Sequence, residues 1–196
     1  MVRWQPDARG RLARAAIELF TEQGFAETTV PQIAARAGLT TRTFFRHFAD
    51  KREVLFAGDD ELPALVARLV VDAPATLGPM LVIAHGLETI AATWFDGQFA
   101  YMRLGRAVIQ ADDGLREREL RKLAGLSEAI GRGFRERGLD ELTALIAAHL
   151  AVSVFDITIS RWLDHAEEQS LAELARDTLL ALQAVAAAPA EQQRSA

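Results

Sequence analysis

Cysteine is absent from this chain of 196 residues. Its absence excludes a disulfide framework, a zinc site built on thiolates and a cysteine nucleophile. Histidine is scarce, and none of the four residues is spaced as HxxxH or HExxH, so a zinc hydrolase lacks its ligands. His165 and Glu168 are spaced to share a metal ion, but a solvated pair is the simpler interpretation. We therefore expect no metal site and no cofactor.

The motifs of common enzyme classes are also missing. Ser153, Ser160 and Ser170 have no glycine-flanked elbow, which nucleophilic serine hydrolases need. No GxGxxG or Walker pattern indicates nucleotide chemistry. The sequence therefore predicts no catalytic residues and no enzyme.

Targeting segments are equally lacking. The N-terminus has no apolar stretch of the kind found in secretory signals. The most apolar run, Leu145 to Ile159, is interrupted by His149 and Asp156 and is shorter than the about 18 residues that a membrane span needs. We expect a cytoplasmic protein that does not cross a membrane.

What the chain does have is helical periodicity almost everywhere. Half of the residues are hydrophobic, and no strand-like alternation persists. The β-branched segment Val152–Ser160 would have no partner strand, so we assign it to a helix. The fold class is therefore predicted as all-α. The expected helices lie at about 12–23, 30–37, 40–48, 51–71 (with a kink near Pro63), 81–95, 99–110, 115–136, 139–162 and 171–185.

Local signals mark the ends of the first helices. Gly24 is placed to end the first one, and Thr29 to Gln32 has the form of a capping box with Pro31 in the first turn. Thr40 can cap the third helix, and Asp50 to Glu53 is a further capping box.

Charge is distributed unevenly. Residues 1–55 carry nine basic and six acidic side chains, whereas the whole chain has a net charge of −5. A basic segment in an acidic chain suggests a polyanionic partner, although an imbalance of this size also fits a solvated surface.

Two short helices joined by a glycine turn give that basic segment a specific form. Val30–Ala37 would be the support helix, Gly38 and Leu39 the turn, and Thr40–Phe48 the recognition helix of a helix-turn-helix. Phe44 and Phe48 would point inward, and Arg42 would point outward toward a major groove. The alternative is an ordinary helical hairpin with a solvated face.

The same residues resemble a known family. The pattern Gly24-Phe25, Thr28-Thr29-Val30, Ile33-Ala34, Ala37 to Thr40, Thr43 to Phe48 and Lys51 is similar to the N-terminal domain of TetR-family transcriptional regulators. The resemblance covers about residues 9–56. It implies a three-helix DNA-binding domain, a helical domain for ligand binding and dimerisation, and a homodimer. The segment Arg42–Arg46 also resembles a subgroup that includes mycofactocin-system regulators, some of which respond to acyl-CoA thioesters.

Carried over by position, the resemblance implies DNA-contacting residues. Thr29 and Lys51 would contact phosphates, and Phe45 and His47 the backbone. Thr41, Arg42 and Thr43 would face the base edges, and Thr40 belongs to the same N-terminal end of the helix, which suits a major groove. Phe45 replaces a common tyrosine, and Arg42 stands where glycine is frequent, which adds a base reader.

The rest of the chain predicts an effector site. Bulky and polar side chains gather on separate helices there, and cavities between helices with such linings are usual small-molecule sites. The candidates are His85, Trp94, Phe95, Phe99, Tyr101, Met102, Arg103, Phe134, Phe155, Asp156 and Trp162. We expect an apolar or aromatic effector, with Arg103 as the partner if it is an acid. Simple core packing is the alternative, and His85 and His149 are expected in the core or the pocket.

The predicted organisation is a regulator, most simply a repressor, with DNA-binding residues 1–50, an effector-binding and dimerisation domain over 51–190 and a flexible tail over 191–196. The protein would bind a palindromic operator as a homodimer through the helices at about 139–162 and 171–186, which are more apolar than one domain can cover. The alternative is that this excess apolar surface lines an internal pocket. Two rival functions are a DNA-organising protein without an effector and a helical enzyme or carrier.

Overall fold

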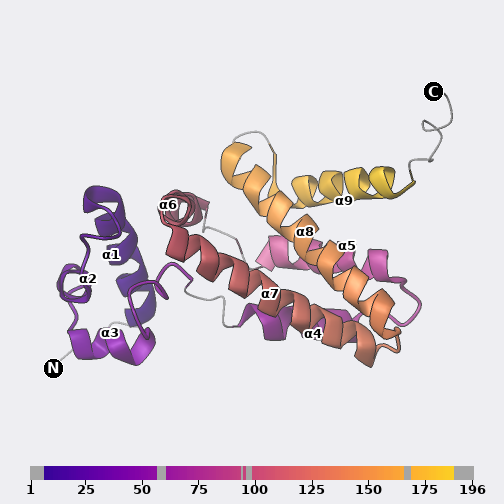
Figure 1. Cartoon of the computed structure of the whole chain (residues 1–196), viewed down its shortest axis with the longest axis horizontal. Helices are drawn as coiled ribbons and strands as arrows, with labels where there is room; N and C mark the ends of the chain where they lie inside the picture. Colours follow the sequence, from indigo (N-terminus) through magenta and orange to yellow (C-terminus); the bar gives the residue numbers. More distant parts are fainter. Residues whose placement is uncertain (1–6, 57–60, 94, 96–98, 166–168, 188–196) are drawn as a thin grey trace. The chain divides into compact units, whose positions relative to one another are not determined.

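The computed structural model describes residues 7–56, 61–93, 95, 99–165 and 169–187. Every regular element among them is an α-helix and none is a strand, which confirms the predicted fold class. The predicted tail lies outside the described residues. The helices are α1 (Ala8–Gln23), α2 (Val30–Arg36), α3 (Thr41–His47), α4 (Leu62–Asp72), α5 (Pro79–Thr93), α6 (Phe99–Gln110), α7 (Asp113–Glu136), α8 (Glu141–His165) and α9 (Leu171–Ala187) (Figure 1).

The ends of α1, α2 and α3 confirm the local signals. Gly24 follows α1 with a φ of 89°, in the left-handed region that glycine adopts without strain. Before α2, the side-chain oxygen of Gln32 accepts from the backbone N–H of Thr29 at 2.8 Å. Before α3, Oγ1 of Thr40 accepts from the N–H of Thr43 at 3.1 Å. These caps satisfy N–H groups that have no partner within their helix.

The expectation of one helix from Lys51 to about Val71 is wrong. Residues 51–56 form turns, and α4 begins only at Leu62. Contacts with distant parts of the chain hold this segment instead, because Val54, Leu55 and Phe56 are all buried in the core of the first unit. The carbonyl of Val54 accepts from the phenol of Tyr101 and not only from its own neighbours.

The local signals of this segment are nevertheless used. Oδ1 of Asp50 accepts from the N–H groups of Arg52 and Glu53, at 2.7 and 3.2 Å, as a capping residue does. Pro63 lies in the first turn of α4, where its missing N–H costs nothing, so it marks a helix start and not a kink.

Two compact units make up the chain. One comprises Met1–Ala64 and Gly97–Gly125, and the other Leu65–Asp96 and Leu126–Ala196. The division describes packing and does not test function, so the functional boundary at residue 50 stays a prediction. The first unit extends beyond residue 50 because α6 packs on α1. The phenol of Tyr101 on α6 donates to the carbonyl of Val54 at 3.0 Å.

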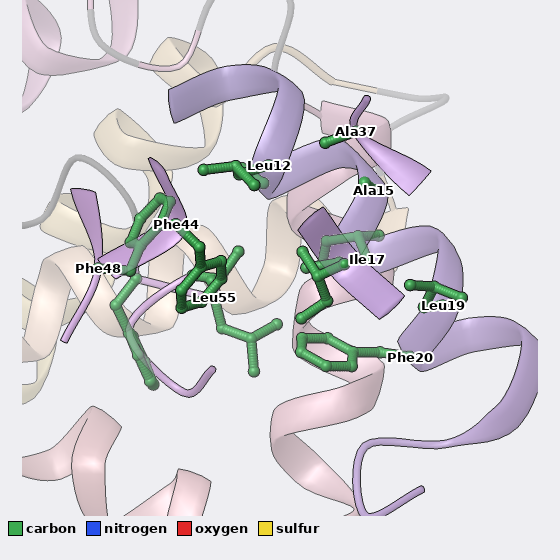
Figure 2. Close-up of a cluster of buried hydrophobic side chains, with 14 of the residues drawn as sticks. Leu12, Ala15, Ile17, Leu19, Phe20, Ala37, Phe44, Phe48 and Leu55 are labelled. Atoms are coloured by element: carbon green, nitrogen blue, oxygen red, sulfur yellow. The ribbon is translucent and has the colours of Figure 1, made fainter. Parts of the chain in front are cut away.

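A single apolar core holds the first unit together. Leu12, Ile17 and Phe20 of α1 meet Phe44 and Phe48 of α3, as Figure 2 shows. Burial of such side chains contributes about 1.5–3 kcal/mol each. The position of α3 is therefore fixed from behind by the side chains of its inner face.

In the second unit, α8 packs against both α5 and α9 (Figure 1). Gly133 on α7 permits a close approach to α4, because a Cβ there would lie 3.0 Å from Cβ of Val70 and 3.1 Å from the carbonyl of Ala67. Arg137, just after α7, donates to the carbonyls of Val70, Pro74 and Leu77 at 3.2, 2.9 and 3.2 Å and so caps the end of α4.

The length and hydropathy of α8 correct one expectation. Residues Glu141–Asp164 reach a mean hydropathy of 1.9, long and apolar enough to cross a membrane. The apolar character continues on both sides of the run Leu145 to Ile159, despite the interruptions at His149 and Asp156. A single such helix is weak evidence for a span, because the core helix of a soluble protein has the same composition.

Candidate functional site

The turn between α2 and α3 requires glycine. Gly38 has a φ of 64°, and a Cβ there would lie 3.0 Å from Nη2 of Arg11. That guanidinium donates to the carbonyl of Ala37, which ends α2. The N–H of Leu39 donates to the carbonyl of Ala34 at 2.8 Å and closes the turn. The angle between support and recognition helix is thus set by α1 as well as by the turn itself.

The recognition helix α3 is divided into a buried and an exposed face. Phe44 and Phe48 are 0% and 4% exposed, and both rings lie on the side of Leu12 and Leu55 (Figure 2). Thr41 and Arg42 are exposed on the other face. The predicted inward and outward orientations are therefore confirmed.

An apolar ring stands among the polar side chains of the exposed face. Phe45 is 59% exposed, and its ring meets that of Phe44 edge to face, with the centroids 5.5 Å apart. Exposed aromatic rings of this size are uncommon on a solvated helix. Most of the Phe45 ring is therefore open to contact from outside the domain.

The arginines near α3 differ in their partners. Arg36 is engaged by Glu22 at 2.7 Å and Glu18 at 3.4 Å. The hydrogen bond from Arg36 lowers the pKa of Glu22 and raises that of Arg36 itself. Within the described residues Arg42 has neither hydrogen bond nor ion pair, and Nη2 of Arg46 lies 3.4 Å from Nε2 of His47. Arg42 is therefore the cation of α3 that is ready for a ligand.

Two of the predicted contact residues already serve as caps. The hydroxyl of Thr29 donates to Gln32 at 2.9 Å, and Oγ1 of Thr40 lies 3.0 Å from Oγ1 of Thr43. All four side chains lie at the N-terminal ends of α2 and α3. The N–H groups and the positive ends of the helix dipoles there favour phosphate oxygens.

Lys51 is held by the protein itself. Its ammonium donates to the carbonyls of Phe25, Ala26 and Thr28 at 2.7, 3.1 and 2.9 Å and lies 4.4 Å from the ring centroid of Phe25. A lysine has three N–H donors, so these bonds use all of them. Lys51 therefore fastens the segment after α3 to the loop between α1 and α2.

Residues 12–57 match the sequence profile of the bacterial regulatory proteins of the tetR family. Over this segment the chain is similar to TetR-family regulators. Among curated relatives, the HTH-type transcriptional regulator TcmR of Streptomyces glaucescens is 38% identical over 91 residues, which cover 46% of this chain and 40% of TcmR. The match thus spans less than half of that relative. The subgroup resemblance of Arg42–Arg46 stays a prediction.

Solved structures extend the likeness in fold to most of the chain. The SmeT–triclosan complex has a TM-score of 0.58 at 23% identity and covers 89% of this chain and 90% of its own; SmeT is a repressor from Stenotrophomonas maltophilia. FadR of Thermus thermophilus with lauroyl-CoA has a TM-score of 0.53 at 24% identity, with coverages of 96% and 100%. At these identities the likeness establishes the fold.

The predicted effector residues fall into both units. Phe99, Tyr101, Met102 and Arg103 belong to the first unit, where Tyr101 supports Val54. The second unit contains His85, Phe95, Phe134, Phe155, Asp156 and Trp162, and Trp94 lies outside the described residues. The candidates are therefore not one group of neighbours.

Three of them do meet. The ring of Phe95 lies 6.1 Å from that of Phe155 and 6.2 Å from that of Trp162, measured between centroids. Phe155 and Trp162 are half-buried, so part of their surface stays accessible, whereas Phe134 is 0% exposed and belongs to the core. This cluster of Phe95, Phe155 and Trp162 is the strongest candidate for an apolar ligand surface.

The polar candidates lie at the surface. His85, Arg103 and Asp156 are exposed, and so is His149. The expectation that His85 and His149 are buried is wrong, because both lie on the outer faces of α5 and α8. The side chains of His165 and Glu168 lie outside the described ones, which form no group of three metal-ligating residues.

Two polar residues of the second unit were missed by sequence reasoning. Arg161 is half-buried on α8, and Thr158 is buried one turn before it. Their spacing of three residues places them side by side on the helix. An arginine and a threonine at this spacing within a largely apolar helix are the signal that could have found them.

Proposed function

We propose that the protein is a ligand-responsive transcriptional regulator that binds a palindromic operator as a homodimer and is released by a small, largely apolar effector. The observation that carries the proposal is the exposed face of α3, where Arg42 has no partner among the described residues and follows the capping residue Thr40. The similarity of residues 12–57 to the tetR family supports the same function.

DNA recognition would use the exposed face of α3. Arg42 can bind the O6 and N7 atoms of guanine, and Thr41 and Thr43 can reach neighbouring base edges. Thr29, Thr40 and His47 would contact the backbone, and Phe45 would pack against sugar or a thymine methyl group. Lys51, for which the resemblance implies a phosphate contact, would support this surface from behind through its three carbonyl bonds.

Dimerisation would use α8 and α9. Large apolar side chains are exposed there, and such patches are typical of protein interfaces. They are Leu142, Leu145, Ile146 and Ile157 on α8 and Leu180 and Val185 on α9. Two helices from each protomer would form a four-helix interface of about 2,000 Å² or more.

Repression and release would follow from a shift between two populations. The effector must bind the form with weak DNA affinity more tightly, by about 5.5 kcal/mol for a swing from 1:99 to 99:1. The cluster of Phe95, Phe155 and Trp162 is the proposed contact surface, and SmeT and FadR have been crystallised with triclosan and lauroyl-CoA.

The test is a selection of bound sequences from random duplex DNA, followed by a screen of apolar compounds for release. A near-palindrome and at least one releasing compound are expected. Binding that is independent of sequence and of every compound would instead indicate a DNA-organising protein. Uptake or turnover of a compound without operator binding would indicate a carrier or an enzyme.

A further inference from the structure

A buried hydroxyl on α8 has no partner. Thr158 is 3% exposed, and its Oγ1 makes no hydrogen bond within the described residues. Other threonines within helices behave differently, because Thr21, Thr89 and Thr178 each donate to the carbonyl four residues earlier at 2.7–2.8 Å. A buried polar group without a partner costs free energy, so this hydroxyl calls for an explanation.

A cation without a carboxylate lies one turn away. Arg161 is half-buried, and Nη1 donates to Oγ1 of Thr178 at 3.1 Å. No acidic side chain pairs with Arg161 among the residues that the structure describes. A guanidinium carries five N–H donors in a planar fork, so four remain for another acceptor. The bond to Thr178 fixes the orientation of that fork.

Aromatic rings flank the same hydroxyl. Phe155 precedes Thr158 by three residues and Trp162 follows it by four, and residues at these spacings are neighbours on a helix. Both rings also meet Phe95. One stretch of α8 thus combines an accessible aromatic surface, an unpartnered hydroxyl and an uncompensated cation.

We propose that Arg161 and Thr158 bind the carboxylate of an aromatic or apolar acid whose body lies on the cluster of Phe95, Phe155 and Trp162. A planar carboxylate matches the guanidinium fork with two parallel hydrogen bonds and can accept a third from the threonine hydroxyl. This inference rests on the proposed effector function and names its ligand class. It assigns the acid to Arg161, since Arg103 is exposed on α6.

A carboxylate of a second subunit is the main rival partner for Arg161. The burial of Thr158 favours a small ligand, because a hydroxyl that is 3% exposed cannot reach the surface of another chain. The three-residue spacing puts Arg161 on the same side of α8 as that enclosed hydroxyl. The test below includes the rival as an outcome.

The test uses 2-naphthoate and its neutral counterpart 2-naphthamide, titrated by calorimetry into the full-length protein without DNA. Wild type should bind the acid at least ten-fold more tightly than the amide, which is about 1.4 kcal/mol. Arg161→Gln should bring the ratio close to one, and Thr158→Val should lower it several-fold. Arg103→Gln, an equal change of charge at an exposed position, should leave it unchanged.

Stability and assembly complete the test. Thr158→Val should be at least as stable as wild type without ligand, because it removes an unpartnered buried hydroxyl. The proposal is overturned if wild type does not prefer the acid, if Arg161→Gln retains the preference, or if that variant only weakens the dimer in sedimentation. Operator binding is measured separately by gel shift. If the wild-type protein binds no operator, the proposed function is refuted, but the naphthoate measurement remains valid.

Discussion

Replacing Lys51 by methionine removes an ammonium that three backbone carbonyls share while keeping most of the apolar stem. The carbonyls of Phe25, Ala26 and Thr28 lie 2.7–3.1 Å away, in the loop between α1 and α2. Without the cation, this loop and the segment after α3 lose their common partner. We therefore expect a destabilised first unit.

The size of the effect follows from these bonds. A hydrogen bond to a charged group contributes about 1.5–3 kcal/mol when it is shielded from water. The bonds to Phe25 and Thr28 are partly buried, whereas the carbonyl of Ala26 is exposed and can be hydrated instead. Lys51 itself is half-buried, which reduces each contribution. The expected loss is about 2–4 kcal/mol.

Two measurements separate this role from a phosphate contact. Urea unfolding should show the loss of stability, and the salt dependence of DNA binding should keep its slope. A contact with one phosphate would instead lower the log–log slope by about 0.9. Arg52→Met, an equal change of charge at an exposed neighbour, is the control. If Lys51→Met keeps wild-type stability and reduces the slope, Lys51 contacts a phosphate and does not stabilise the first unit.

Three other substitutions test the turn, the interface and an ion pair. Gly38→Ala should cost about 1–2 kcal/mol in urea unfolding, because its φ of 64° strains any residue with a Cβ; an unchanged midpoint would contradict this. Leu180→Arg should convert a dimer to a monomer in sedimentation, whereas an intact dimer would remove α9 from the interface. Glu22→Gln should lower stability at pH 7, because Arg36 lowers the pKa of Glu22 below its ordinary 4.5. That stability is fully present above pH 4.5 and is lost as the pH falls through the lowered pKa, so the two proteins should converge in acid; a difference that does not shrink as the pH falls below 4.5 would count against the pair.

The sequence predicted what depends on neighbouring residues. Thr29 and Thr40 cap their helices within three residues, and Phe44 and Phe48 share a face through the helical period alone. The helix-turn-helix and its outward Arg42 could therefore be placed before the structure was known. The similarity to the tetR family lies in this same local segment.

Long-range packing decided what the sequence missed. The turns at residues 51–56 are held by contacts with distant parts of the chain, among them the hydrogen bond from Tyr101 to the carbonyl of Val54. The carbonyls that hold Lys51 lie 23 or more residues earlier. Composition could not show which aromatic residues of the effector list are neighbours, because Phe95, Phe155 and Trp162 meet only through helix packing.

Whether Arg42 reads a base from the exposed face of α3 is tested by measuring base preference at every position of the selected operator for wild type and Arg42→Ala. We expect a near-palindrome with half-sites about 34–36 Å apart. Arg42→Ala should lose about 1–3 kcal/mol on that site and relax the preference at one position of each half-site. An unchanged preference in Arg42→Ala, or no enriched sequence with wild type, would contradict this expectation.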